Sequence, residues 1–273
     1  MDLIAASSAA AVEIKNLVAT SFAARYDDLA ATLEASRSAV VLAEENLAEV
    51  PADLVAAAWT QYGNALRLTG RFAEAGEALA RAGERCLSDQ PTPTSAHLRS
   101  VQASLHLNTG RFASAADCLL AAITDLQALG DPIGEARLHI LLGVVYKDWG
   151  KFPEAFHSFQ NAMALVGPAT PLDIVVAASH NLFAALIESG RLEDAAAALA
   201  VLEPHYRRLT SPRILAKTEW MRARLCRAMR QLPAARLAYE RAYDLLIAEP
   251  KAPDLIELTN EMAGLFIPLK PGD

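Results

Sequence analysis

The sequence has few of the residues that would build a disulfide framework. Its 273 residues include only three cysteines, Cys86, Cys118 and Cys226, which lie far apart and form no CxxC pair. An odd number of scattered cysteines favours buried, reduced thiols and a cytoplasmic location. The first fifteen residues lack the basic start of a secretory signal, and Glu13 and Lys15 interrupt their apolar stretch. No apolar run is as long as a membrane span, so we expect a soluble protein that does not bind membranes.

Motifs of catalytic and cofactor-binding sites are also missing. The sequence contains no GxxxxGK[ST], GxGxxG, HExxH or GxSxG, and its six histidines show no metal-ligand spacing. Runs that alternate apolar and polar residues, as in strands, are lacking as well. We therefore expect a helical, non-enzymatic protein with no cofactor and no metal.

What the sequence does contain is a repeat. TGRFAEA at 69–75 returns as TGRFASA at 109–115, WGKFPEA at 149–155, SGRLEDA at 189–195 and MRQLPAA at 229–235, a step of forty residues each time. Glycine recurs at 70, 110, 150 and 190, and alanine at 75, 115, 155, 195 and 235. A fixed period of this length indicates a repeat architecture.

Each repeat predicts two helices joined by a tight turn. Residues 53–69 and the residues after 72 both place apolar side chains at helical spacing, and Gly70 between them can end a helix in the left-handed conformation. Alanine at 75 and its equivalents keeps the two helices close. One such hairpin cannot bury both of its apolar faces, so neighbouring hairpins must stack.

Residues 58–82 resemble the tetratricopeptide repeat (TPR). The positions of its pattern are filled by Trp59, Tyr62, Gly63, Leu66, Gly70, Ala75, Leu79 and Ala82, and residues 142–162 fit as well. The fit weakens where Phe183 replaces a small residue and where Arg230 replaces the turn glycine. The forty-residue step also exceeds the usual 34 residues and resembles long-repeat arrays of bacterial regulatory proteins.

The expected fold is all-α: an α-solenoid of about six stacked antiparallel helix pairs with a C-terminal capping helix. The pairs are predicted at 2–24 with 28–48, 53–69 with 72–87, 93–109 with 112–129, 133–149 with 152–166, 172–189 with 192–209, and 212–230 with 232–248, and the cap at 253–267. We expect residues 1–273 to form one array, with units at about 1–50, 51–90, 91–130, 131–170, 171–210 and 211–250 and the cap at 251–268.

Charge is unevenly distributed along the chain. The net charge is −7, but residues 204–242 hold ten Lys or Arg against two acids, a balance of +8, which leaves −15 for the remainder. Within this segment Arg213, Lys217, Trp220, Arg224 and Arg227 are spaced for one helix face. Such asymmetry favours an acidic partner, although a solvated face with Trp220 packed between repeats is the alternative.

The TPR resemblance implies which residues line the concave surface, because there the first helix of each pair carries the binding positions. It implies binding roles for Lys217, Trp220, Arg224 and Arg227. In register with these lie His180, Arg137, Lys147, Asn64 and Arg67, whose alternative is a purely structural role. Asn64 matches a position of the family's carboxylate clamp, but Thr60 stands where that clamp has lysine.

The first functional hypothesis is a protein–protein interaction module of a bacterial-type regulatory system. Its concave groove would bind an acidic or amphipathic segment of another protein. The alternatives are a subunit that senses a signal or sequesters a sigma factor or transcription regulator, and a sensor of small anionic ligands or accessory subunit of an enzyme complex. Direct DNA binding is not expected from an acidic chain without a separable helix-turn-helix. Pairing of two copies through the N- or C-terminal helices stays open.

Overall fold

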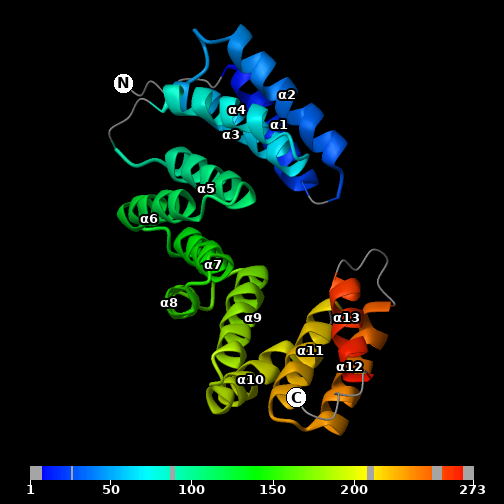
Figure 1. Ribbon diagram of the computed structural model, residues 1–273. Coiled ribbons are helices and arrows are strands. Elements are labelled where there is room, and N and C mark those ends of the chain that lie inside the picture. The colour runs from blue at the N-terminus through cyan, green and yellow to red at the C-terminus, as the bar shows by residue number, and fades with distance from the viewer. Residues whose placement is uncertain (1–7, 26, 87–89, 208–211, 248–253, 267–273) are drawn as a thin grey trace. The chain divides into compact units, whose positions relative to one another are not determined.

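The computed structural model describes residues 8–25, 27–86, 90–207, 212–247 and 254–266, and these ranges form thirteen α-helices without a strand. Two compact units divide the chain, residues 1–151 and residues 152–273. The helices of the first unit are α1 (Ala9–Ala24), α2 (Leu29–Glu45), α3 (Ala52–Leu68), α4 (Phe72–Arg85), α5 (Pro93–Asn108), α6 (Phe112–Leu129) and α7 (Pro132–Asp148). Consecutive helices of this unit pack against one another as antiparallel neighbours (Figure 1).

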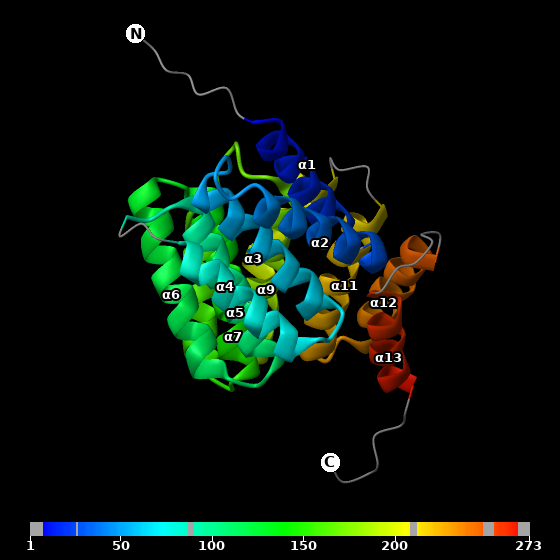
Figure 2. The same ribbon diagram turned by 90° about the horizontal axis from the view of Figure 1, so that it is seen from above.

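The second unit continues the pattern. Its helices are α8 (Phe152–Ala164), α9 (Leu172–Glu188), α10 (Leu192–Arg207), α11 (Pro212–Ala228), α12 (Leu232–Ile247) and α13 (Asp254–Phe266). The most extensive pairing in this unit joins α11 to α12. The last helix, α13, packs beside α12, and the two lie side by side in both views (Figures 1 and 2).

Every repeated turn has the same hydrogen-bond pattern. At the first of these turns Gly70 N donates to Arg67 O at 3.0 Å and Arg71 N to Leu66 O at 2.9 Å, and the same two bonds recur in each later turn. This is the Schellman arrangement, which needs a left-handed residue after the helix. The four turn glycines have φ between 71° and 79°, and Arg230 takes the same conformation with φ 59°.

The helices of a hairpin meet through small side chains. Ala75, Ala115, Ala195 and Ala235 are completely buried, and Ala155 is 2% exposed. A Cβ at Gly63 would lie 2.7 Å from Leu79 Cδ2, so α3 and α4 pack closely only with glycine there. The recurring small residues therefore set the distance between the two helices, as the sequence predicted.

The predicted fold class and helix boundaries are confirmed. Helix ends fall within two or three residues of the predicted ends, except that the beginnings of the first and last predicted helices and the ends of several others lie outside the described residues. The pair at 133–149 and 152–166 crosses the boundary between the units, so each of its helices is described within its own unit. The prediction of one array over residues 1–273 stays a prediction.

One expectation about hydropathy needs correction. Helix α6, with 18 residues, is long and apolar enough to cross a membrane by length and composition, contrary to the sequence analysis. It is the one such helix in the described ranges. Its buried residues, among them Leu119, Ala122 and Ile123, face the core beside α5 and α7. Within the first unit, 39% of this apolar window is buried.

Candidate functional site

A cavity of about 550 Å³ lies between α9 and α11, the first helices of two successive hairpins. These two helices contact each other directly. The wall of the cavity is apolar where Leu172, Val176, Ala177 and Ile214 line it. Its polar lining consists of Asp173, His180, Asn181, Arg213 and Lys217. The structure thus brings together three residues that the sequence analysis selected on two separate helices: His180, Arg213 and Lys217.

His180 is the most perturbed titratable group beside this cavity. Burial lowers its pKa from 6.5 to about 4, and the positive charges of Lys217 and Arg224 lower it further. Its Nδ1 atom is buried and has no hydrogen-bond partner among the described residues. The ring meets the Trp220 ring edge to face, with 6.4 Å between centroids. At neutral pH His180 is therefore an uncharged imidazole wedged between α9 and α11.

The basic face of α11 is partly neutralised by α13. Asp254 Oδ2 lies 3.1 Å from Arg213 Nε and 3.7 Å from Lys217 Nζ. One carboxylate of α13 is thus shared by two cations, and Asp173 adds a second carboxylate to the lining of the cavity. The side chain of Lys217 is more buried than that of Arg213, which is half exposed.

A second acid of α13 organises the other end of the same face. Glu261 Oε2 accepts hydrogen bonds from Trp220 Nε1 at 2.9 Å and from Tyr239 Oη at 2.8 Å. Its other oxygen, Oε1, lies 3.1 Å from the Arg224 guanidinium. Burial and the hydrogen bond to Glu261 raise the pKa of Tyr239, so its hydroxyl stays protonated and donates.

Helix α13 therefore covers the centre of the predicted binding face. Trp220 is only 3% exposed and shares a buried cluster with Leu258 of α13. The acids and the apolar side chain that the sequence analysis assigned to a partner are supplied here by the chain itself. Of the two sequence interpretations, the burial of Trp220 agrees with packing between helices. Arg227, one turn further on, is exposed and has no ion pair among the described residues.

The candidate residues of the first unit form a separate group. Arg67 donates to Asn64 Oδ1 at 2.9 Å and to Asn108 Oδ1 at 2.8 Å, which ties α3 to α5. Asn64 is only 7% exposed, so most of its surface packs against other residues of the protein. On α7, Arg137 is exposed and Lys147 is half-buried. Their placement on a concave lining and their role in binding both stay predictions.

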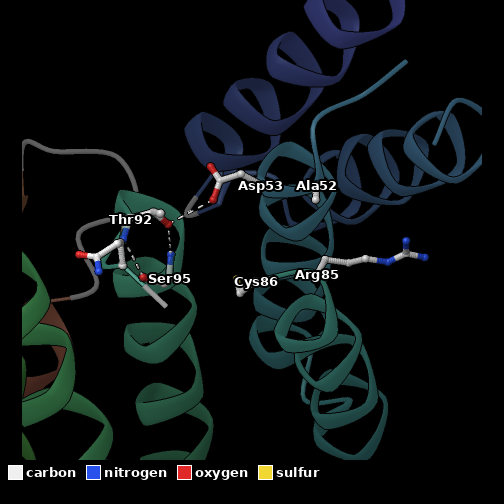
Figure 3. A pocket seen from close by; sticks show the side chains of 7 residues that line it. Ala52, Asp53, Arg85, Cys86, Thr92 and Ser95 are labelled. Carbon is white, nitrogen blue, oxygen red and sulfur yellow. Dashed lines mark hydrogen bonds between the residues drawn. The ribbon is translucent and has the colours of Figure 1, made fainter. Parts of the chain in front are cut away.

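A smaller cavity in the first unit has a structural explanation. About 350 Å³ in volume, it is lined by Asp53, Arg85, Cys86, Thr92 and Ser95 among others (Figure 3). The Asp53 carboxylate accepts hydrogen bonds from the hydroxyls of Thr92 at 3.1 Å and Thr94 at 2.7 Å, and Thr92 also caps α5 together with Ser95. Arg85 points away from these residues, toward Glu44. The polar groups that line this cavity thus join α3 to α5.

Sequence reasoning missed Asp254 and Glu261. A signal was present, because each lies 41 residues after its partner, Arg213 or Trp220. The same offset joins Arg67 to Asn108 and Asp53 to Thr94 in the first unit. Helix α13 therefore sits where the first helix of a further repeat would sit. Within the described ranges, no group of three His, Cys, Asp or Glu side chains is arranged to hold a metal ion.

Comparisons with known proteins establish the fold. No protein-family model matches the sequence, and a comparison with curated proteins finds no match. Among solved structures, the apo form of RapI superposes with a TM-score of 0.72 at 10% identity, over 92% of this chain and 70% of that chain. BtubC from P. vanneervenii gives a TM-score of 0.62 at 18% identity, over 88% and 94%.

A third structure is NprR in complex with its cognate peptide NprX, which gives a TM-score of 0.60 at 14% identity, over 96% of this chain and 75% of that chain. Identities this low show a shared fold and nothing finer. The protein therefore has a TPR-like helical-repeat fold.

Proposed function

We propose that the protein is a non-enzymatic interaction module that binds a short segment of another protein between α9 and α11. The observation that carries this proposal is the cavity in which His180, Asn181, Arg213 and Lys217 converge on an apolar wall. An apolar wall with a few convergent polar groups is the usual composition of a binding site. The NprR structure in complex with a peptide offers support at the level of the fold.

The cations of the cavity, Arg213 and Lys217, lie beside the acids Asp173 and Asp254 and offer a pairing site to an acidic side chain of the segment. Lys217 is held 3.7 Å from Asp254, a distance that leaves its ammonium free to form a shorter bond. A partner carboxylate would compete with Asp254 for Lys217, while its apolar side chains would contact Val176 and Ile214. Binding would weaken with salt because the attraction is screened. In this proposal the chain serves a bacterial-type regulatory system.

The test uses a variant that fills the cavity. Ala177 lines it from α9, and Ala177→Phe would occupy part of its volume. The matched control is Ala197→Phe on the exposed side of α10. Random peptides displayed on phage are selected against the wild-type protein and then measured against both variants. We expect the selected peptides to lose about tenfold or more in affinity for Ala177→Phe and to bind the control as they bind the wild type.

A charge variant completes the test. Lys217→Glu should weaken acidic peptides, whereas Arg236→Glu, an exposed charge reversal on α12, should not. Peptides that bind Ala177→Phe and Lys217→Glu as tightly as the wild type would exclude this site.

The volume of the cavity between α9 and α11 also suits a small-molecule ligand. About 550 Å³ lies within the range of small-molecule sites, so an anionic metabolite is a second candidate ligand. A thermal-shift screen with nucleotides and carboxylic acids tests it, since a ligand that binds the folded state raises Tm. A hit whose shift disappears in Ala177→Phe, combined with failure of the peptide selection, would favour the sensor function.

A further inference from the structure

The turn between α11 and α12 departs from the other repeated turns in its backbone. Four of the five turns use glycine for the left-handed residue, and this one uses Arg230 with φ 59°. A residue with a Cβ is less stable than glycine in that conformation, because its Cβ approaches the following carbonyl oxygen. Strained backbone of this kind tends to persist where a side chain has a function.

The surroundings of Arg230 form an exposed basic and apolar surface. Arg227 and Arg230 are exposed, and neither has a side-chain hydrogen bond or ion pair with another described residue. Met229, Leu232 and Leu237 are 41%, 52% and 50% exposed. We call these five residues, together with Arg236, the α11–α12 edge.

Two of the other four turns pair their cation with a nearby acid. Arg71 pairs with Glu74 and Arg191 with Asp194, each three residues later. The α11–α12 edge has no such acid, because no Asp or Glu occurs from residue 220 to residue 239. At the exposed side of α12, Arg236 of the edge pairs with Glu240.

The composition of the edge selects its type of partner. Three arginines are fewer than the cluster of basic residues that binds an anionic bilayer strongly. Residues 227–237 include no aromatic side chain on which a nucleic-acid base would stack. Exposed arginines beside leucine and methionine instead suit an acidic protein groove with an apolar floor.

The chain itself carries such a groove, on α1 and α2. A cavity of about 420 Å³ there has an apolar lining of Leu17, Val41 and Leu42. Its charged lining consists of Glu13, Glu34, Glu45 and Arg37, a balance of −2. The three glutamates are exposed and have no ion-pair partner among the described residues. We call this the α1–α2 groove.

We propose that the α11–α12 edge of one molecule docks into the α1–α2 groove of a second copy of this chain. The arginines of the edge would pair with the glutamates of the groove, and Leu232 and Met229 would contact Val41 and Leu42. The contact joins two different surfaces, so it generates a ring or a linear chain of molecules, or a dimer if both contacts close at once. This proposal does not depend on the cavity between α9 and α11.

The experiment measures the mass of the full-length protein in solution by sedimentation velocity. The protein is studied from about 5 to about 200 μM, a range that covers weak and transient interfaces. We expect the average mass of the wild type to rise with concentration in about 50 mM salt and to fall again in about 500 mM salt, because screening weakens exposed charge pairs. A wild type that stays monomeric throughout the low-salt series overturns the proposal.

Charge reversal then identifies the surfaces. The edge variant carries Arg227→Glu and Arg230→Glu, and the groove variant carries Glu34→Lys and Glu45→Lys. In each variant the edge and the groove carry charge of the same sign, so two molecules of one variant repel each other at this contact. Each variant should therefore associate more than about tenfold more weakly than the wild type. Mixed in equal amounts, the two variants again present opposite charges, and association should return. Loss in both variants without recovery on mixing, or persistence of association in either, contradicts the contact.

Matched controls keep the outcome interpretable. Arg71→Glu with Arg111→Glu changes the net charge as the edge variant does, at the equivalent turns of the first unit. Glu77→Lys with Glu84→Lys on the exposed side of α4 matches the groove variant. Both controls should associate like the wild type. Arg227→Ala with Arg230→Gly is the second edge variant; it removes the charges while relieving the backbone, so its loss of association cannot reflect misfolding.

Discussion

The α3–α4 hairpin of the first unit and the α11–α12 hairpin of the second unit have the same backbone arrangement. They differ in the neighbouring helix that packs on their tryptophan. Both have a completely buried alanine between their helices, Ala75 and Ala235, and both end their first helix in a Schellman turn. In the first hairpin Trp59 donates to Glu44 of the preceding hairpin, and in the second Trp220 donates to Glu261 of the following helix. The repeat thus fixes the helix spacing and leaves the tryptophan contacts to be set by each neighbour.

The largest expected effect breaks the contact that distinguishes the second hairpin. Glu261→Ala removes the acceptor of Trp220 and Tyr239 and the counter-ion of Arg224, groups that are largely buried. We expect a loss of about 3 kcal/mol in the free energy of unfolding, because three polar groups lose their partner at once. Urea unfolding followed by tryptophan fluorescence measures it.

The first hairpin provides the control for this variant. Glu44 accepts from Trp59 at 2.7 Å but lies 3.4 Å from Arg85, and about a third of its side chain is exposed. Glu44→Ala should therefore cost about 1 kcal/mol. Glu261→Gln keeps an acceptor for Trp220 and should lie between the two. Equal losses for Glu44→Ala and Glu261→Ala would mean that α13 is no more than a peripheral cap.

The comparison also explains what sequence could and could not foresee. The turn glycines and alanines recur at fixed positions because local geometry demands them, so the helices and their boundaries were predictable. The burial of Trp220 was predicted only as the alternative to a binding role, because it depends on α13, which follows the last recognisable repeat. The spacing of Arg213, Lys217, Trp220 and Arg224 showed a common helix face, but not that two acids 41 residues downstream would cover it.

The convergence of His180 with Arg213 and Lys217 was partly predictable. The forty-residue register placed His180 and Lys217 on the inner faces of successive first helices, and the cavity between α9 and α11 is lined by both. The register gave no information on Asn181 or Asp173, which reach the same cavity from neighbouring positions on α9. The register of one helix face also missed Asp254 of α13 beside Lys217, which only the 41-residue offset between partners on successive first helices indicates.

A smaller effect is expected from pH, at a position where the two units differ. Thr60 and Ser100 of the first unit do not titrate, whereas His180 at the equivalent position has its pKa lowered from 6.5 to about 4. The groups around it are Lys217, Arg224, Asp254 and Glu261. As the pH falls below 6.5 the unfolded chain binds a proton at this histidine before the folded chain does. The stability that His180 contributes at pH 7 is therefore lost progressively down to pH 4.

The measurement is the difference between two stability curves. Wild type and His180→Asn are unfolded in urea at several pH values, and the wild type should lose roughly 2 kcal/mol more than the variant between pH 7 and pH 4. Titration of the imidazole by NMR gives the pKa directly. Parallel stability curves, or a titration near 6.5, would show that His180 is solvated.

The smallest effect exchanges the turn residues of the two hairpins. Gly70 has φ 79°, and a Cβ there would meet nothing within 4 Å, so Gly70→Arg adds backbone strain and no clash. It should cost about 1 kcal/mol, and Arg230→Gly should gain somewhat less than 1 kcal/mol, because glycine also gives the unfolded chain more freedom. Thermal unfolding of both variants measures the pair. Arg230→Gly should at the same time weaken the self-association assigned to the α11–α12 edge, since it removes one of its two unpaired arginines. A variant that is more stable and yet associates as the wild type does would mean that Arg230 owes its strained position to something other than this contact.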